Sequence, residues 1–352
     1  MSYEAILIVS FGGPEKQADV IPFLENVLRG KDVPRERMLN VAEHYYHFDG
    51  KSPINEQNRN LMAALKKELA EHQIALPVYL GNRNWHPLLA DTLSQMKEDG
   101  VKRALAFFTS AFSSYSGCRQ YREDIAVARE AVGEGAPVVD KLRVFFNHPG
   151  FIESVAEHTI GGLEQLSLEE RGRAKVVFTA HSIPLSMAQS SNYQPQLLEA
   201  SRLVADRVAS ERAGRNDFDL VYQSRSGPPT QPWLDPDILD FLRQYKQGGG
   251  RDPVVIVPIG FVSDHMEVLY DLDTEAKDLC AEIGLRMVRV SCAGTHPRFV
   301  SMIRELIVER MALDGGSGGV DRPALGVLGP SHDVCPADCC PAPRRPMMAS
   351  KS

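Results

Sequence analysis

A histidine and a glutamate in the second half of the chain each follow an apolar segment that is typical of a buried strand. His181 comes after 175–179, KVVFT, and Glu267 comes after 254–259, VVIVPI. If these segments are neighbouring strands of a parallel sheet, both side chains face the crevice at the carboxyl ends of the strands. A histidine exchanges protons near neutral pH, and a nearby carboxylate can accept or tune them. A hydrogen-bonded histidine at a strand end, without a chemical role, is the alternative for His181.

Acidic residues recur at spacings of three and four directly after the second of these segments. They are Asp264, Glu267, Asp271, Glu275, Asp278 and Glu282. Such spacing places the carboxylates on one face of a helix. Together with His265, Asp264 and Asp271 would form a chain of titratable groups that passes protons or leads a hard cation inward. A solvated helix face is the alternative, and Asp264 with Glu267 also fits a helix-capping box.

Cysteines cluster near the carboxyl terminus, where Cys335, Cys339 and Cys340 lie within six residues. One metal site built from these three needs a fourth ligand, and the candidate is Cys118, the remaining cysteine in a polar loop. Four thiolates suit an iron–sulfur cluster or a zinc ion. The other two cysteines, at positions 280 and 292, fit ordinary buried thiols in a helix and at a strand end. A disordered extension with free thiols is the alternative for the tail.

The overall composition is that of an ordinary soluble protein, with 43% hydrophobic and 24% charged residues among 352. The net charge of −7 argues against a broad surface for nucleic acid or anionic membranes. The amino terminus lacks the basic region and cleavage site of a signal peptide, and no apolar run reaches the roughly 18 residues that span a membrane. We therefore expect a cytoplasmic protein, in which structural disulfides are rare.

The elements that must position these residues alternate between short apolar runs and amphipathic stretches. Strands are expected at 5–11, 78–80, 104–109, 141–146, 175–179, 220–223, 254–259 and 286–291. Helices are expected at 19–28, 58–71, 87–99, 121–132, 149–165, 194–211, 238–245 and 296–311, and from about residue 264 onwards. Repeated strand–helix units predict an α/β fold with parallel sheets flanked by helices. The expected domains are 1–150 and 151–313, followed by a linker and cysteine-containing tail at 314–352.

Two loops have compositions that suit a ligand site. Residues 40–55 carry several aromatic side chains and are expected to be weakly structured; they suit the wall of a flat, apolar ligand site, or equally a loop packed on a domain surface. Residues 81–87, GNRNWHP, follow a strand and form a candidate site edge. The sequence has no GxGxxG, P-loop, HExxH, GxSxG, CxxC or kinase signature, which removes several common chemistries.

Seven segments resemble, in their order, those of the ferrochelatase family. They are ILIVSFGGPE, GKSPINEQ, YLGNRNWHP, TSAFSSYSGCRQY, FTAHSIPLS, YQSRSGPPTQPWLDP and PIGFVSDHMEVLYDLD. The resemblance extends from residue 4 to the cysteine tail. It implies two Rossmann-like, chelatase-type domains with a porphyrin in the cleft between them. It also implies a lyase of haem biosynthesis that inserts ferrous iron into the porphyrin and releases two protons.

The resemblance also implies roles for individual residues. His181 would face the pyrrole nitrogens, taking up their protons or binding the iron, and Glu267 would be its acidic partner across the macrocycle. Asp264, His265 and Asp271 would line the route for protons or metal. The substrate-binding residues would be Ser52, Arg83, Tyr121, Gln223 and Trp233.

The resemblance is closest to actinobacterial ferrochelatases, which hold a [2Fe–2S] cluster on one mid-chain cysteine and three near the carboxyl terminus. The implied ligands here are Cys118, Cys335, Cys339 and Cys340. That branch converts coproporphyrin III, a water-soluble substrate that needs no membrane docking, and the polar residues around GKSPINEQ agree. The protein would be a monomer with at most a transient partner from haem biosynthesis. Glu15 replaces a tyrosine of related Gram-positive enzymes, which puts a metal-ligand role at that position in doubt.

Four alternatives stay open at this point. The enzyme could convert protoporphyrin IX, or it could insert cobalt or nickel into another tetrapyrrole. The chain could be a non-catalytic porphyrin or metal carrier on the same fold. The cysteine site could hold a structural zinc ion.

Overall fold

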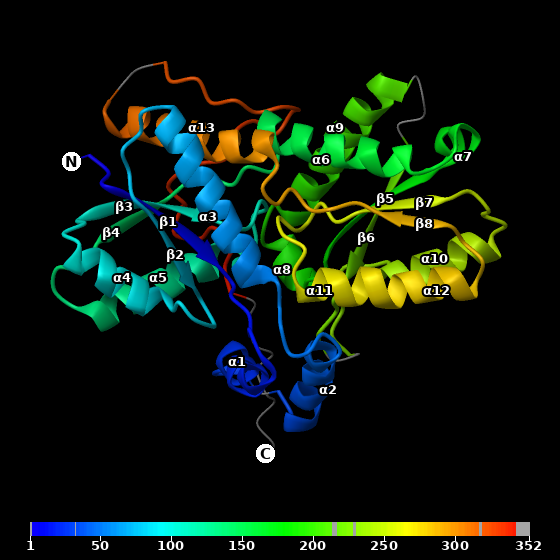
Figure 1. The fold of residues 1–352 in the computed structure, drawn as a ribbon, viewed down its shortest axis with the longest axis horizontal. Helices are drawn as coiled ribbons and strands as arrows, with labels where there is room; N and C mark the ends of the chain where they lie inside the picture. The colour runs from blue at the N-terminus through cyan, green and yellow to red at the C-terminus, as the bar shows by residue number, and fades with distance from the viewer. Residues whose placement is uncertain (1, 32, 213–216, 228–229, 317–318, 343–352) are drawn as a thin grey trace.

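The computed structural model describes residues 2–31, 33–212, 217–227, 230–316 and 319–342. Two parallel four-stranded sheets lie side by side, and helices flank each of them (Figure 1). The first sheet has the strand order β2-β1-β3-β4, and the second has β6-β5-β7-β8. The predicted α/β fold with two helix-flanked parallel sheets is confirmed. Within the described ranges, no helix is both long and apolar enough to cross a membrane.

The strands are short and regularly spaced along the chain. They are β1 (Ala5–Ser10), β2 (Val78–Asn82), β3 (Arg103–Phe108), β4 (Val138–Lys141), β5 (Lys175–His181), β6 (Phe218–Gln223), β7 (Val254–Val257) and β8 (Met287–Arg289). The α-helices are α1 (Val20–Leu28), α2 (Arg35–Tyr46), α3 (Ile54–Glu71), α4 (Leu89–Glu98), α5 (Gln120–Val132), α6 (Pro149–Glu164), α7 (Leu168–Arg173), α8 (Leu185–Gln189), α9 (Tyr193–Arg212), α10 (Ile238–Gln247), α11 (Met266–Val268), α12 (Lys277–Glu282) and α13 (Pro297–Asp314). Three further helical elements are η1 (Gln17–Asp19), which is 3₁₀, and η2 (Tyr115–Arg119) and η3 (Leu269–Ala276), which are π-helical.

The first sheet is buried on both faces because its central strand is apolar at every position but the last. In β1, Ile6 and Ile8 belong to the cluster that includes the α3 leucines, whereas Leu7 and Val9 belong to the cluster that α4 and α5 complete. Successive strand residues point to opposite faces, so a continuous apolar run serves two helical layers.

The second sheet is built in the same way and carries the candidate catalytic residues. Phe178 of β5 and Val255 of β7 belong to the core under α6 and α9, and Val177 and Ile256 belong to the cluster with α10 and the π-helix η3. β5 and β7 are direct neighbours, with Val177 opposite Ile256. The carboxyl ends of these two strands therefore meet at the same edge of the sheet.

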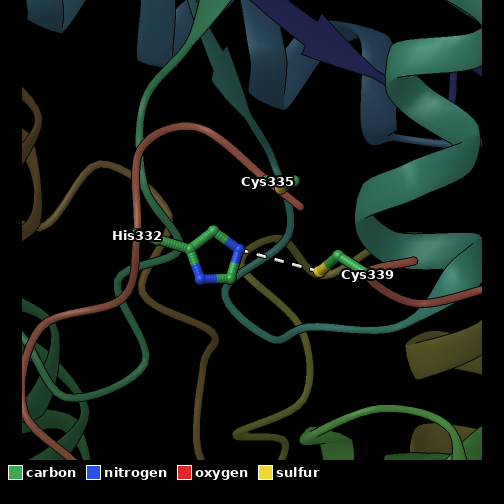
Figure 2. Close-up of side chains that lie close together, drawn as sticks. All are labelled: His332, Cys335 and Cys339. Atoms are coloured by element: carbon green, nitrogen blue, oxygen red, sulfur yellow. Dashed lines mark hydrogen bonds between the residues drawn. The ribbon is translucent and has the colours of Figure 1, made fainter. Parts of the chain in front are cut away.

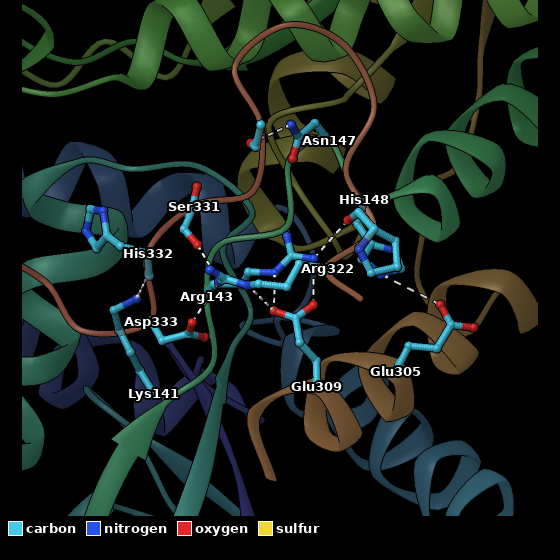
Figure 3. Close-up of polar contacts among 12 residues, drawn as sticks. Lys141, Arg143, Asn147, His148, Glu305, Glu309, Arg322, Ser331, His332 and Asp333 are labelled. Carbon is cyan, nitrogen blue, oxygen red and sulfur yellow. Dashed lines mark hydrogen bonds and ion pairs between the residues drawn. The ribbon is translucent and has the colours of Figure 1, made fainter. Parts of the chain in front are cut away.

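The carboxyl-terminal tail is fastened to the first half of the chain by a polar network (Figure 3). At its centre the buried Arg143 donates two hydrogen bonds to Glu309 of α13, at 2.8 and 2.9 Å, and one to the carbonyl of Pro323. Arg322 of the tail donates to Glu309 at 3.0 Å and to Asp333 at 2.7 Å. The tail is thus held by side chains on β4, on the segment after it and on α13.

Further side chains hold the backbone of the same tail. The amide of Asn147 donates to the carbonyls of Leu325 and Gly329, at 3.0 and 2.9 Å. The carboxylate of Glu199 accepts from the backbone N–H groups of Val327 and Leu328. These bonds order a segment whose composition is that of a linker.

Three segments differ from what the sequence pattern indicates. Residues 142–146 lie beyond the end of β4, and they are apolar because they enter the core, where Phe145 stacks on Phe107 at 5.1 Å. Residues 35–46 form α2, although part of this stretch was expected to be weakly structured. The helix expected from residue 264 begins at Met266 and widens into η3. These three differences depend on tertiary packing, which short-range sequence patterns do not predict.

Candidate functional site

His181 and Glu267 come together at the carboxyl end of the second sheet. His181 is the last residue of β5, and Glu267 lies in α11, after the neighbouring strand β7. His181 Nε2 is 3.8 Å from a carboxylate oxygen of Glu267. The two side chains are 32% and 46% exposed, so a ligand can reach both. The expected meeting of an imidazole and a carboxylate from distant parts of the chain is therefore present.

The hydrogen bonds of the His181 ring define which of its nitrogens is free to react. Nδ1 contacts the carbonyl oxygen of Ser182, which can only accept, so Nδ1 carries a proton. In the neutral ring Nε2 is then unprotonated and faces Glu267. This nitrogen can accept a proton or bind a metal ion.

His265 is a half-buried residue that holds Glu267 in place. It caps α11, where its Nδ1 accepts from the backbone N–H of Glu267 at 3.2 Å. This contact replaces the capping box between Asp264 and Glu267 that the spacing allowed. Desolvation lowers the pKa of His265, and the charge of Glu267 opposes this shift only in part. The lowered pKa favours the neutral ring.

Asp271 lies on η3, one helical turn after Glu267 in the sequence. Its carboxylate accepts from Gln223 Nε2 at 3.1 Å and from the hydroxyl of Ser224. Burial is the largest cause that raises the pKa of Asp271, to about 7, and the charge of Glu267 raises it further. Gln223 in turn pairs with His181 in the register of β5 and β6. Asp271, Gln223 and Ser224 therefore form one hydrogen-bonded group of side chains beside the strand end that carries His181.

Asp264, in contrast, is tied to a different set of partners. Its carboxylate accepts from Arg289 at 2.6 Å and from the backbone N–H of Cys292 at 3.2 Å. Its backbone exchanges two hydrogen bonds with the side chain of Gln57 on α3. The bonds with Gln57 link the two halves of the chain. Asp264 also lines a cavity of about 400 Å³, together with Gln57 and His158.

The residues expected to bind substrate from the first half form a separate group. Arg83 pairs with Asp124 of α5 and lies over the ring of Tyr121, with its guanidinium carbon 4.4 Å from the ring centroid. Ser52 is buried beside the glycine turn after β1, where its N–H donates to the carbonyl of Pro14 at 2.8 Å. Trp233 belongs to the second half, where it forms a β-bridge with Pro184, three residues after His181.

Sequence reasoning missed an aromatic contact between the two halves. His44 of α2 stacks on Tyr270 of η3, with ring centroids 3.8 Å apart and planes 8° apart. Burial lowers the pKa of His44, and the charge of Glu267 opposes this effect, so His44 faces the same region as the glutamate. The aromatic segment thus packs on the wall of the candidate site. The aromatic composition of residues 40–55 was the only signal for this contact in the sequence, because the two rings come from helices far apart in the chain.

The cysteines named from the sequence also converge. Cys118 is buried in η2 and hydrogen-bonds with Cys335, and Cys339 Sγ is 3.7 Å from Cys340 Sγ. The hydrogen bond with Cys118 is the main cause that lowers the pKa of Cys335, to about 4, and Lys141 also lowers it. A thiol whose pKa is lowered in this way is suited to bind a metal ion. Cys280 and Cys292, the other two cysteines, are buried as expected.

A histidine that sequence reasoning did not select lies beside two of these cysteines. The ligand atoms of His332, Cys335 and Cys339 all lie within 4.8 Å of one another (Figure 2). His332 lies three residues before Cys335, a spacing that could have drawn attention to it.

The fold is that of chelatases. The structure superposes on SirB from Bacillus subtilis with Fe³⁺ with a TM-score of 0.53 and 12% identity, covering 91% of this chain and 100% of that one. A sirohydrochlorin chelatase SirB from Bacillus subtilis subspecies spizizenii, in complex with cobalt, gives a TM-score of 0.50 with the same identity and coverage. At this identity the likeness establishes the fold.

Sequence comparison then gives the family. A profile of the ferrochelatase family matches residues 3–311. The ferrochelatase of Rhodopirellula baltica is 60% identical over 348 residues, which cover 99% of this chain and 96% of that protein. The coproporphyrin III ferrochelatase of Streptomyces coelicolor is 50% identical over 353 residues, covering 97% and 94%. The chain belongs to the ferrochelatase family and is a metal-inserting enzyme.

Proposed function

We propose that the enzyme inserts Fe²⁺ into coproporphyrin III, producing Fe-coproporphyrin III and two protons, as a step of haem biosynthesis. The observation that carries the chemistry is the 3.8 Å approach of His181 to Glu267 in an exposed position at the sheet edge. The choice of substrate is supported by relatives at about 50% identity from Streptomyces and Nocardia, which are named coproporphyrin III ferrochelatases. Protoporphyrin IX is the alternative substrate, because the Rhodopirellula relative is named only a ferrochelatase.

The proposed catalytic residues act on the pyrrole protons. In the free macrocycle two inner nitrogens carry protons that the entering metal must displace. Nε2 of His181 accepts one of these protons, and the carboxylate of Glu267 accepts the other. Imidazole and carboxylate are also acceptable ligands for Fe²⁺, so the same pair can bind the incoming ion. Bending of the ring in the cleft, at a cost of about 1–5 kcal/mol drawn from peripheral binding, would turn the lone pairs outward.

The proposed route for protons or metal uses the residues behind this pair. Asp271 has a pKa raised to about 7 by burial, so it is partly protonated at neutral pH and can relay a proton from Glu267. His265 positions Glu267 through the cap of α11. Asp264, held by Arg289, lines the cavity of about 400 Å³ behind them, from which a cation could approach.

Substrate binding is proposed for residues of both halves. Gln223 and Trp233 come from the second half, and Ser52, Arg83 and Tyr121 come from the first. We further propose domains at 1–150 and 151–313, with a cluster-binding tail at 314–352, of which 317–318 and 343–352 lie outside the described residues. The enzyme would work in the cytoplasm as a monomer, with a transient partner that receives the product.

The substrate proposal predicts a clear preference between two porphyrins. Purified enzyme with Fe²⁺ under anaerobic conditions should convert coproporphyrin III with a kcat/KM roughly tenfold or more above that for protoporphyrin IX, because two additional propionates offer charge-assisted contacts. The measurement is the rate of metalloporphyrin formation by absorbance, in detergent concentrations that keep both substrates monomeric. Equal or reversed kcat/KM values would contradict the substrate assignment and leave the family assignment intact.

We propose that Cys118, Cys335, Cys339 and Cys340 hold a [2Fe–2S] cluster. The donor set fits this group, since Cys118 hydrogen-bonds with Cys335 and Cys339 Sγ lies 3.7 Å from Cys340 Sγ. The positive charges of Lys141 and Arg122 also act on Cys335. When bound, such a cluster can exchange one electron. A structural zinc ion is the alternative.

Cys118→Ser is expected to remove the cluster. The wild-type protein as isolated should be reddish, with thiolate-to-iron absorption and stoichiometric iron and sulfide, and the variant should be colourless because a hydroxyl replaces one thiolate ligand. Cys280→Ser, in a buried thiol far along the chain from the site, is the matched control and should keep its colour. A colourless wild-type protein that contains zinc would favour the alternative.

A further inference from the structure

The cysteine site contains one more metal-binding side chain than a [2Fe–2S] cluster needs. Four cysteines would supply a complete set of thiolate ligands, and the ring of His332 lies within 4.8 Å of the ligand atoms of two of them, Cys335 and Cys339. Its Nε2 is 3.6 Å from Cys339 Sγ, and the dashed line in Figure 2 marks this contact. The ring also hydrogen-bonds with Cys335. The surplus histidine therefore requires a role other than completing the ligand set.

The position of His332 is fixed by residues on either side of it (Figure 3). Its carbonyl oxygen accepts from the buried Lys141 at 3.3 Å. The next residue, Asp333, is held by Arg322, which also donates to the carbonyl of Ser331 at 2.8 Å. Both neighbours of His332 are thus tied to the network around Glu309, so its ring is directed toward the thiols although the residue lies at the surface.

The chemistry of the contact gives its direction. A metal-bound thiolate sulfur has no proton and can only accept, so an imidazole nitrogen at this distance acts as an N–H donor to it. Such a bond withdraws electron density from the sulfur and stabilises the more negative, reduced state of an iron–sulfur cluster. Arg119, whose guanidinium donates to the carbonyl of Cys339 at 3.3 Å, reinforces the same side of the site.

We propose that His332 is a positioning residue of the cluster, which donates an N–H···S hydrogen bond to the Cys339 thiolate and thereby raises the reduction potential of the cluster. This inference rests on the proposed [2Fe–2S] cluster. The tail would then do more than supply thiolates, because the polar network around Glu309 that docks the tail also orients the His332 ring toward Cys339.

The test is a reductive titration of the intact protein with dithionite, followed by absorbance. His332→Ala should leave the four thiolates in place and make the cluster harder to reduce, by roughly two- to tenfold in the equilibrium constant, which is the effect of one hydrogen bond. His332→Gln, which keeps an N–H donor at similar reach, should restore much of the wild-type midpoint. His72→Ala, at an exposed histidine on the end of α3, is the matched control and should titrate like wild type.

The other possible results each decide a stated part of the proposal. An unchanged midpoint in the His332→Ala protein would remove the role of His332 and leave the cluster proposal standing. A wild-type protein without iron and sulfide would remove both. If the alanine variant does not retain a cluster, the glutamine variant decides: retention there supports the hydrogen bond. Loss in both variants, with nitrogen ligation in the electron paramagnetic resonance of the reduced wild-type protein, would make His332 a ligand and overturn the proposal.

Discussion

Replacing His181 with alanine is expected to lower the rate of metal insertion by about a hundredfold to ten-thousandfold while porphyrin still binds. His181 Nε2 lies 3.8 Å from Glu267, and losing it removes the proposed acceptor of a pyrrole proton. The ring does not support the core, since it lies at the end of β5 and is partly exposed. The measurement is metalloporphyrin formation under saturating substrate, alongside a fluorescence titration for porphyrin binding.

Two further variants distinguish the loss of a reactive group from a general effect of substitution on the structure. Glu267→Gln keeps the side-chain volume and the cap of α11 but removes the charge, so it should also lose most of the activity. His72→Ala removes an exposed histidine away from the site and should be fully active. Near-normal turnover in the His181 variant would eliminate its proposed role, and loss of porphyrin binding in that variant would assign it to substrate binding.

Replacing Glu309 with alanine is expected to lower the free energy of unfolding by about 3–5 kcal/mol. Glu309 is the shared partner of Arg143 and Arg322, and both it and Arg143 are buried. Removing the carboxylate leaves a buried guanidinium without its counter-charge and loosens the junction between α13 and the tail. The measurement is denaturant unfolding monitored by circular dichroism, with tail protection followed by hydrogen exchange.

The controls for this second prediction test the reason for it. The double variant Arg143→Met with Glu309→Leu removes both buried charges and should be more stable than Glu309→Ala alone. Glu169→Ala breaks an ion pair with Arg173 in which both side chains are largely exposed, and it should change stability by less than about 1 kcal/mol. If Glu309→Ala unfolds like the Glu169 variant, the buried network does not carry the stability of the tail.

Much of the architecture was determined by local patterns in the sequence. Runs such as 254–257 are apolar at every position, which is typical of a strand buried on both faces, and their alternation with helices predicted parallel sheets. The same patterns placed His181 at a strand end. Clustering of the three tail cysteines, with Cys118 as their partner, was likewise visible without coordinates. Short-range periodicity and residue chemistry are sufficient for such predictions because they depend on a few neighbouring residues.

Tertiary structure alone decided how these parts serve the site. The pairing of β5 with β7 brought His181 to Glu267, whereas Arg289 drew the carboxylate of Asp264 into other contacts. The stacking of His44 on Tyr270 and the docking of the tail through Arg143 are contacts between residues far apart in the chain. Such contacts depend on the packing of whole layers, and no local pattern encodes which distant side chain will be the partner. The sequence therefore determined which groups could react, and the packing decided which of them meet.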